Sequence, residues 1–361
     1  MTHTNLHSEA SNSQNISMKA PNLLLFGNPL LDVTVKVSDD ELLKKYNLDR
    51  NGQAEVSLDK LTNIFNDARA RYRTFKYSLG GSSLNSARIL ATLGQRNLLF
   101  FGAIGNDQNG KVVREILKRS GVNSCLQELN TRTGTCVCLY QGSDRSLIAN
   151  IGAALKCEKS HIEANISKFE TDVEYYYIEG FFIPEKMDIC RYLYNKYSQN
   201  LNTLLITNLN APYIVKNFQK DITWLVKKAD IVFGNRDEFE ELASINGLAS
   251  MDDLIADLLG GYTKTHRQKV IIITDGSNPV LCYEGNVNGI ETNIIEVPKV
   301  KHDKIIDTTG AGDSFVSGFL YALMKGSDMR QCIELGCKIS SIVIQTIGCN
   351  LPKNINVEEL S

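Results

Sequence analysis

The sequence predicts an α/β fold, a three-layer α/β/α sandwich with a mostly parallel central sheet. Short apolar runs recur along the chain, segments of helical period separate them, and the runs are apolar almost without a break. Strands of a parallel sheet have this character because helices cover both of its faces. We expect buried strands within residues 23–26, 97–101, 175–178, 204–206, 231–233 and 270–273.

Helical segments follow several of these runs. Residues 111–120 have a helical period and end at Gly121, a residue that suits the end of a helix, and residues 186–199 form a second such segment. In sheets of this kind, ligands bind at the carboxyl ends of the strands. We therefore expect the site beside the segments that follow the apolar runs.

Two segments depart from this rhythm. Residues 31–37 and 134–140 alternate apolar and polar side chains with a period of two, which is typical of half-exposed strands. We expect them to form a small antiparallel sheet outside the main core. That sheet would act as a lid over the site, built from parts of residues 31–78 and 131–151.

The domain boundaries follow from composition. Residues 1–20 are rich in Ser, Asn, Thr and His, which predicts a disordered tail. We expect one domain over residues 21–352 and a short C-terminal tail over residues 353–361.

Charge and length exclude several classes of function. The 361 residues carry 39 basic and 41 acidic side chains without a long basic run, which argues against a nucleic-acid partner. No apolar stretch approaches the roughly 18 residues of a membrane-spanning helix. We therefore expect a protein without nucleic-acid or membrane partners.

The cysteines and histidines point to a reducing compartment and away from metal chemistry. The nine cysteines include no C-x-x-C pair and follow no secretory leader, so we expect free thiols in the cytoplasm. The five histidines form no metal-ligand cluster. Zinc chemistry and histidine-based nucleophilic catalysis are therefore poor candidates.

The most informative segment is Asp-Thr-Thr-Gly-Ala-Gly-Asp at residues 307–313. We expect a strand over residues 304–306, a glycine-rich turn, and a helix from Ala311. Amides at a helix start have no intrahelical partner and attract anions, and Gly310 and Gly312 allow a phosphate to approach them. The sequence therefore predicts an anion site at this helix start.

Asp313 lies in the first turn of that helix, beside the predicted anion site. A carboxylate there would repel an anion unless it had another task, and the obvious one is to accept a proton from a hydroxyl that attacks a phosphate. The segment thus predicts phosphoryl transfer. A tight turn before a helix with an acidic first turn explains the same residues without function.

Two further segments suit a sugar. Asp32, in the segment 27–32 after the first strand, could accept hydrogen bonds from both hydroxyls of a diol, whereas an Asx turn at the chain reversal explains it without function and is favoured when this segment is taken alone. Gly80 and Gly81 would let the backbone approach a ligand, and Ser82 and Asn85 would open the following helix. The alternative is a flexible turn capped by a serine.

Asn235 and Glu238 match a capping box, which alone explains both. The functional interpretation places Glu238 near a hydrated Mg²⁺ on nucleotide phosphates. Arg145, in a polar turn, could offset phosphate charge or could be an ordinary surface arginine. The P-loop motif is absent, and so is Gly-x-Gly-x-x-Gly after the first strand, which disfavours a dehydrogenase.

Together these residues resemble the ribokinase-like (PfkB) carbohydrate kinases, and within them the branch that acts on adenosine. The resemblance runs from about residue 22 to 352 and is carried by the segments 27–32, 80–85, 133–136, 145–150, 233–235 and 305–313. It implies a ribokinase-like fold and a phosphotransferase with an alcohol acceptor. The implied purine-salvage reaction is Mg²⁺-dependent transfer of the γ-phosphoryl of ATP to the 5′-hydroxyl of adenosine, giving AMP and ADP.

The resemblance also implies roles for individual residues. Asp313 would be the base, the amides of Gly310, Ala311 and Gly312 would stabilise developing charge, and Arg145 would close on the phosphates. The substrate would meet Asn28, Asp32, Gln53, Gly80, Gly81, Ser82, Asn85, Cys136, Leu147, Ile151 and Phe182. ATP would lie near Asn235, Thr274, Gly276 and Cys337, and Glu238 would organise Mg²⁺.

Three positions depart from the family pattern. Thr309 replaces a common Asn in the phosphate turn, Asp275 replaces a common Gln near the nucleotide, and Cys337 replaces a common His near the ATP adenine. None of them touches the proposed base.

Other functions remain open at this point. The chain could be another ribokinase-like kinase that acts on a sugar, inosine or guanosine. It could also be a non-catalytic nucleoside-binding subunit, although such a subunit would be expected to lose Asp313 or its neighbouring glycines. The resemblance favours a monomer.

Overall fold

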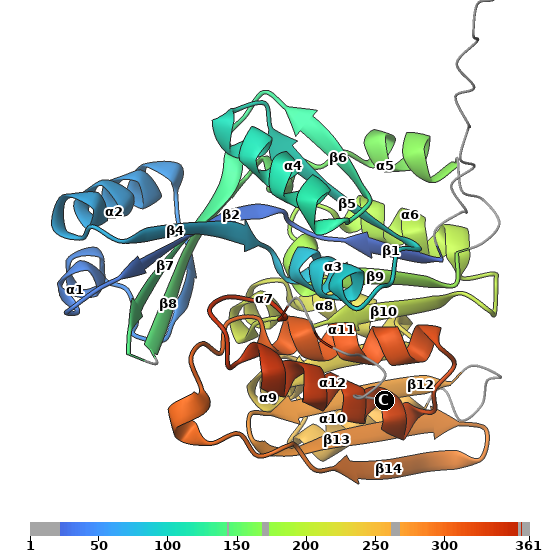
Figure 1. Cartoon of the computed structure of the whole chain (residues 1–361). Helices are drawn as coiled ribbons and strands as arrows, with labels where there is room; N and C mark the ends of the chain where they lie inside the picture. The colour runs from blue at the N-terminus through green and yellow to red at the C-terminus, as the bar shows by residue number, and fades with distance from the viewer. Residues whose placement is uncertain (1–21, 143, 168–172, 261–267, 353–354, 356–361) are drawn as a thin grey trace, which may run out of the picture.

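The structure, a computed structural model, describes residues 22–142, 144–167, 173–260, 268–352 and 355. The predicted tails, residues 1–20 and 353–361, lie outside the described residues except for residue 355. A nine-stranded sheet forms the centre, in the order β14-β13-β12-β11-β10-β9-β1-β5-β6 (Figure 1). Its strands are β1 (Leu23–Phe26), β5 (Leu98–Gly105), β6 (Ser124–Leu129), β9 (Tyr175–Glu179), β10 (Leu204–Asn208), β11 (Ile231–Asn235), β12 (Lys269–Asp275), β13 (Asn278–Asn286) and β14 (Gly289–Ile295).

The central sheet is mostly parallel. The strands from β6 to β12 pair in parallel, and only β13 and β14 are antiparallel additions at one edge. Each predicted apolar run lies within or overlaps one of these parallel strands. Their burial on both faces explains why the runs lack polar residues.

Helices cover both faces of this sheet and complete three layers. One face packs against α3 (Ser82–Thr92), α4 (Gln108–Ser120), α11 (Ala311–Met324) and α12 (Met329–Val343). The other packs against α5 (Lys159–Ile166), α6 (Met187–Tyr197), α7 (Pro212–Asn217), α8 (Gln219–Lys228), α9 (Arg236–Ile245) and α10 (Met251–Gly260). The predicted sandwich is confirmed.

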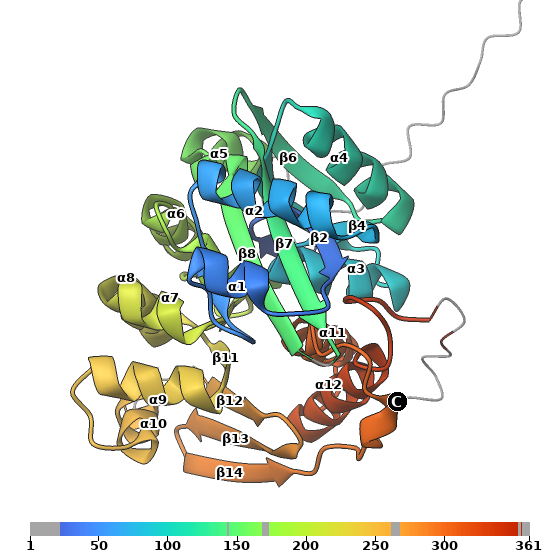
Figure 2. The ribbon, with the colours of Figure 1, turned by 90° about the vertical axis from the view of Figure 1, so that its left-hand side faces the viewer.

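A second, five-stranded sheet stands beside the main body, in the order β3-β8-β7-β2-β4 (Figures 1 and 2). Its strands are β2 (Leu30–Lys36), β3 (Gln53–Glu55), β4 (Phe75–Gly80), β7 (Thr133–Gln141) and β8 (Asp144–Gly152). The helices α1 (Glu41–Tyr46) and α2 (Leu58–Arg71) cover its outer face, with their own apolar core.

The prediction that this small sheet is antiparallel is only partly right. β2 pairs with β4 and β7 pairs with β8 in antiparallel fashion, but β2 runs parallel to β7 and β3 runs parallel to β8. The physical reason is the connection: the chain passes through β5 and β6 of the main sheet before β7 enters beside β2 in the same direction.

The predicted strand at residues 304–306 is wrong. His302–Lys304 forms a short 3-10 helix, and the amides of Ile306 and Asp307 donate to the carbonyl of Ile344 at 2.8 and 3.1 Å. This apolar segment is therefore held by the end of α12 rather than by a sheet. Within the described residues, no helix is long and apolar enough to cross a membrane.

Candidate active site

A cavity of about 600 Å³ lies between the small sheet and the carboxyl ends of the main-sheet strands. Its lining from the small sheet includes Asp32, Gln53, Cys136, Arg145, Leu147 and Ile151. From the main body come Asn28, Gly81, Ser82, Asn85, Asn235, Glu238, Thr274, Gly310, Ala311, Gly312 and Asp313. Residues predicted from segments far apart in the sequence thus share one cavity.

The helix α11, whose first residues line this cavity, begins at Ala311 as predicted. Gly310 is the residue before α11 and adopts a left-handed φ of 78°. The amide of Ala311 donates to the carbonyl of Thr308 at 3.2 Å, so it is already engaged. The amides of Gly310, Gly312 and Asp313 have no partner among the described residues, so these three are available to an anion.

Asp313 is held by two donors. Ser82 Oγ donates to its Oδ1 at 2.7 Å, and Asn85 Nδ2 donates to its Oδ2 at 2.9 Å. Burial raises the pKa of Asp313, and these two hydrogen bonds oppose the rise. Ser82 and Asn85 were predicted to contact the substrate, whereas in this structure both donate to the proposed base.

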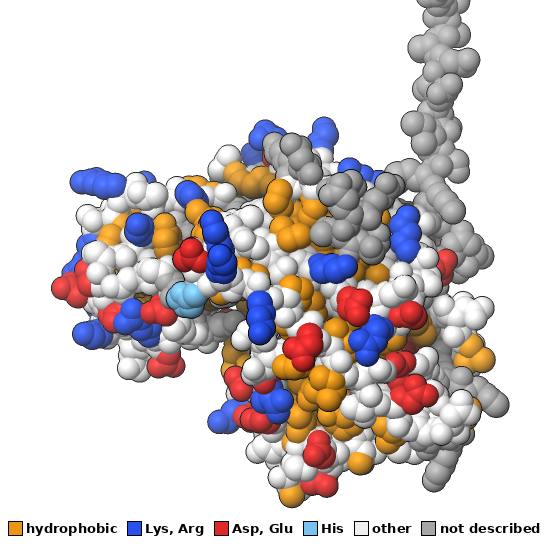
Figure 3. Space-filling view, turned by 60° about the horizontal axis from the view of Figure 1, so that its bottom comes forward, with side chains coloured by type: hydrophobic (Ala, Val, Ile, Leu, Met, Phe, Trp, Pro, Cys, Tyr) orange, Lys and Arg blue, Asp and Glu red, His pale blue; other side chains and the backbone are white. Residues whose placement is uncertain are grey.

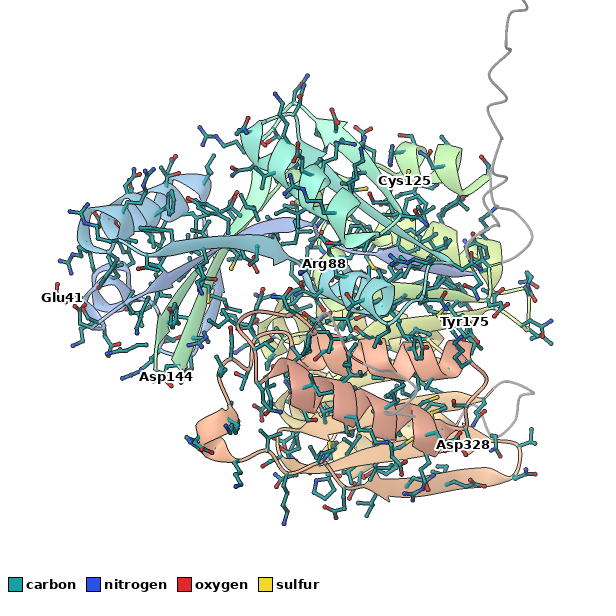
Figure 4. The ribbon with its side chains drawn as sticks, viewed as in Figure 1. Glu41, Arg88, Cys125, Asp144, Tyr175 and Asp328 are labelled. Atoms are coloured by element: carbon teal, nitrogen blue, oxygen red, sulfur yellow. The ribbon has the colours of Figure 1, made fainter. Side chains whose placement is uncertain are left out.

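Arg88 fixes the direction of the Asn85 amide. Its Nη1 donates to Asn85 Oδ1 at 3.2 Å, and its Nη2 donates to Asn350 Oδ1 at 2.7 Å. A guanidinium can only donate, so the oxygen of Asn85 must face Arg88 and the nitrogen must face Asp313. Figure 4 shows Arg88 where β4 meets α3, at the junction of the two sheets.

Asp32 lies on β2, opposite Cys136 of β7, and faces the same cavity. Burial raises the pKa of Asp32 to about 7, with Arg88 lowering it and Asp313 raising it further. Gly80 does not line the cavity. A Cβ at Gly80 would lie 2.0 Å from Asp32 Oδ1, so this glycine makes room for the carboxylate.

Arg145 belongs to the start of β8 rather than to the predicted turn. Its guanidinium binds Asp307 Oδ1 at 3.1 Å and the carbonyl of Ile306 at 2.9 Å. Asp307 also accepts from the amides of Thr309 and Gly348, at 3.0 and 2.9 Å. The buried carboxylate of Asp307 therefore joins the small sheet to the turn before α11.

Asn235 and Glu238 form a complete capping box at the start of α9. Both oxygens of Glu238 accept from Asn235, at 2.8 Å from its amide and 3.0 Å from Nδ2. Burial raises the pKa of Glu238 to about 7. Among the described residues, no three His, Cys, Asp or Glu side chains converge to hold a metal ion.

Asp275 is bound by an ion pair. It accepts from Arg236 Nε at 2.8 Å, and the pair is partly exposed at the end of β12. Thr309 lines the cavity, with its amide on Asp307. Thr309 and Asp275, two of the three positions that depart from the family pattern, thus both contact other residues of the chain.

Besides Gly80, three predicted nucleotide or substrate residues lie outside the cavity lining. Phe182 is fully buried in the main core, 6.2 Å from the ring of Phe26, and its neighbour Phe181 lines the cavity instead. Gly276 occupies a left-handed turn between β12 and β13 (φ 57°) outside the cavity lining. Cys337 packs into the core from α12 and does not line the cavity either.

Two aromatic side chains that were not predicted form part of the cavity wall. Phe181 and Tyr213 line the cavity with their rings 6.1 Å apart and inclined by 37°. Neither residue was predicted. Phe181 lies in a 3-10 turn after β9, where neither strand nor α-helix period tells which phenylalanine faces inward, and Tyr213 lies on the short helix α7, which carried no site motif.

Glu179 was also missed. It is fully buried at the end of β9 and accepts from the amides of Asn28, at 2.7 Å, and Ser83. Burial raises its pKa to about 8, although the two amides lower it. An acidic residue at the carboxyl end of an apolar strand was the available signal.

Asn28 has a free acceptor in the cavity wall. Its Nδ2 donates to the carbonyl of Phe181 at 2.6 Å, while its buried Oδ1 has no partner among the described residues. A buried acceptor without a partner is costly. A ligand that donates a hydrogen bond would satisfy it.

Comparison with known proteins identifies the family. The model for pfkB family carbohydrate kinases matches residues 51–356. The adenosine kinase of Schizophyllum commune is 32% identical over 338 residues, covering 92% of this chain and 97% of that relative. Adenosine kinase 2 of Arabidopsis thaliana is 33% identical over 344 residues, covering 92% and 96% of the two chains.

Solved structures of adenosine kinases are also similar to this chain. Anopheles gambiae adenosine kinase, in complex with P1,P4-di(adenosine-5) tetraphosphate, superposes with a TM-score of 0.83 at 28% identity, covering 93% of this chain and 99% of the other. The adenosine kinase of Trypanosoma brucei brucei gives a TM-score of 0.79 at 29% identity, covering 91% and 100%. The predicted ribokinase-like fold is confirmed, and the chain belongs to the pfkB family of carbohydrate kinases.

Proposed function

We propose that this chain is an adenosine kinase, which transfers the γ-phosphoryl group of ATP to the 5′-hydroxyl of adenosine and releases AMP and ADP. The observation that carries the proposal is one cavity that combines a carboxylate at a helix start, Asp313, with the Asp32 carboxylate opposite it. The shared activity of the curated relatives supports it.

In this mechanism Asp313 accepts the proton of the attacking hydroxyl. Its two donors, Ser82 and Asn85, favour the ionised carboxylate that a general base requires. The amides at the start of α11 stabilise the negative charge that develops on the transferred group. Arg145 lies in the cavity wall and pairs with Asp307 in this structure, so it would offset further phosphate charge only on leaving that pair.

The cavity also suits a nucleoside rather than a free sugar. Asp32 can accept from both hydroxyls of a ribose. Phe181 and Tyr213 offer ring faces to a base, and the unpartnered oxygen of Asn28 offers an acceptor. The small sheet, which supplies Gln53, Leu147 and Ile151, is the proposed lid.

The donor set fits a magnesium ion that arrives with ATP. Mg²⁺ keeps several waters and binds through one or two carboxylates and substrate phosphates, and its charge helps to neutralise the phosphates. Glu238, with both oxygens on Asn235, suits contact through water, and Thr274 lines the same end of the cavity.

A nucleoside panel tests the proposed function. Adenosine, inosine, guanosine and ribose are each offered with MgATP, and the products are separated by chromatography. We expect AMP from adenosine and much slower product formation from the other three. Faster turnover of ribose or inosine would instead favour the alternative, a different sugar or nucleoside kinase.

The ribose role of Asp32 gives a second prediction. Asp32→Ala removes hydrogen bonds to a charged acceptor, worth about 1.5–3 kcal/mol, so adenosine should bind roughly 10- to 150-fold more weakly by calorimetry without ATP. Asp59→Ala, the same change at an exposed position on α2, is the control and should leave the affinity unchanged.

The same contact predicts a pH dependence. Because the pKa of Asp32 is raised to about 7, the carboxylate is progressively protonated as the pH falls through 7 and loses an acceptor. Adenosine binding should weaken below about pH 7 in the wild type, and this dependence should disappear in Asp32→Ala. An unchanged affinity in the variant would remove Asp32 from the site.

We further propose a monomer in the cytoplasm without nucleic-acid partners. The outer face of the small sheet is already covered by α1 and α2, which leaves no open face there for a second copy (Figure 2). The eight buried cysteines, Cys136, Cys138, Cys157, Cys190, Cys282, Cys332, Cys337 and Cys349, are free thiols, which suits a reducing compartment. On the face in Figure 3, basic and acidic side chains are interspersed, without a broad basic patch.

A further inference from the structure

Asn210, on the segment after β10, contacts the serine that holds the proposed base. The amide of Gly180 donates to Asn210 Oδ1 at 2.6 Å, and Asn210 Nδ2 donates to Ser82 Oγ at 2.8 Å. A backbone amide can only donate, so the side-chain oxygen must face Gly180 and the side-chain nitrogen must face Ser82. The orientation of this amide therefore follows from the chemistry of its partners.

The direction of the next hydrogen bond follows as well. The Ser82 oxygen accepts from Asn210, and the hydroxyl has one proton left to donate. Asp313 Oδ1 lies 2.7 Å away, and an ionised carboxylate can only accept. The three hydrogen bonds therefore all point the same way, from the Gly180 amide through Asn210 and Ser82 to Asp313. The last of them stabilises the ionised form of the base.

The backbone at Asn210 supports a specific role. Its φ is 68°, and the amide of Ala211 donates across it to the carbonyl of Leu209 at 2.9 Å. Such a tight turn is rare and strained, and strain at polar residues concentrates at functional sites. A Cβ at Gly180 would lie 2.6 Å from the carbonyl oxygen of Leu209, so this segment needs a glycine opposite it.

We infer that Asn210 is a positioning residue for the proposed base: it turns the Ser82 hydroxyl so that its proton is donated to Asp313. The inference rests on the proposed function, because it assigns Asn210 to a base that works in phosphoryl transfer. Without Asn210, the Ser82 hydroxyl could rotate to other acceptors, and the ionised form of Asp313 would lose a donor.

Other titratable groups face Asp313 and must be accounted for. They come from β2, β9 and the segment after α12: Asp32, Tyr177, Glu179 and Cys349. A substitution at Asn210 leaves all of them in place. A change in the titration of Asp313 between the wild type and an Asn210 variant therefore reports the lost hydrogen bond.

The test is the pH profile of kcat/KM for adenosine in Asn210→Gly. Glycine accepts the left-handed backbone, so only the amide is lost. A base works when ionised, so a higher pKa of Asp313 moves the acidic limb to higher pH. We expect an upward shift of about one pH unit, the size of one hydrogen bond to a charged group.

Two variants sharpen the result. Asn210→Asp would accept the Ser82 proton and add a negative charge, so its acidic limb should lie higher still. Asn47→Gly is the matched control, because Asn47 also has a left-handed φ, of 49°, but is exposed at the end of α1. Its profile should match the wild type.

A double-mutant cycle separates positioning from general damage. Ser82→Ala should raise the limb by itself, and adding Asn210→Gly should raise it no further. A loss of activity at every pH without a shift would overturn the inference, as would additive shifts. Carbon NMR titration of the Asp313 carboxyl gives the same comparison without turnover, so absence of adenosine phosphorylation in the wild type would refute only the proposed function.

Discussion

Asp313→Asn is expected to lower kcat by about 10²–10⁴, the usual contribution of a general base, with little change in adenosine affinity. The side chain keeps its shape but can no longer accept a proton. Its new amide nitrogen would also face either Ser82 or Asn85, both of which donate in the wild type. Single-turnover kinetics and calorimetric binding of adenosine measure the two effects separately.

The control for charge is Asp303→Asn, which makes the same change at an exposed aspartate before the glycine-rich turn. It should keep both kcat and affinity. Turnover of Asp313→Asn within a few-fold of the wild type would exclude Asp313 as the base. A large loss of adenosine affinity would instead assign it to substrate binding.

The wild-type pH profile adds a second check on the same residue. Burial raises the pKa of Asp313 above that of an ordinary aspartate. Because the base works when ionised, activity should fall as the pH drops through that raised pKa. The fall should be absent from the residual activity of Asp313→Asn.

The parts of the site that could be predicted from the sequence are those whose chemistry is local. The turn and helix start at residues 307–313, the capping box of Asn235 with Glu238, and the alternating strand that carries Asp32 each fit within a short segment. Their backbone geometry follows from nearby residues. Their functional meaning came from several such segments occurring in one chain.

The parts that could not be predicted depend on contacts between distant segments. Asn210 meets Ser82 across 128 positions, and Glu179 meets Asn28 across 151. No periodicity or spacing reports such pairs. The segment 304–306 failed for the same reason: its apolar residues suit a strand, but the carbonyl of Ile344 provides its hydrogen bonds.

The small sheet shows an intermediate case. The two-residue period located two of its five strands, β2 and β7, but only β2 alternates between buried and more exposed residues as expected, because β7 is largely buried on both faces. Strand direction depends on the path of the chain between them, which passes through the main sheet. The same period is compatible with parallel and antiparallel neighbours, so the relative direction of the strands could not be predicted from the sequence.

Gly310→Ala should damage both stability and activity. A left-handed backbone costs an L-residue about 1–2 kcal/mol, and Gly310 has a φ of 78°. The added Cβ would also lie 2.5 Å from Cys349 Cβ and 2.7 Å from its Sγ. Relief requires movement of the start of α11, so we expect the loss of stability to reach about 2–4 kcal/mol.

The same movement would displace the amides that we propose for the phosphate site. Loss of one such donor lowers kcat by about 10²–10³, which is the effect we expect for Gly310→Ala. Gly326→Ala is the matched control: its φ is 80°, but a Cβ there meets nothing within 4 Å. In urea denaturation, its free energy of unfolding should fall only by the cost of the left-handed backbone. Its turnover should stay unchanged.

A rescue variant isolates the steric term. Cys349→Gly removes the two atoms that the new methyl group would meet most closely, so Gly310→Ala with Cys349→Gly should recover part of the lost turnover while it keeps the backbone cost. If Gly310→Ala behaved like Gly326→Ala, the start of α11 would tolerate the change. Its amides would then not need the placement that phosphoryl transfer demands of them.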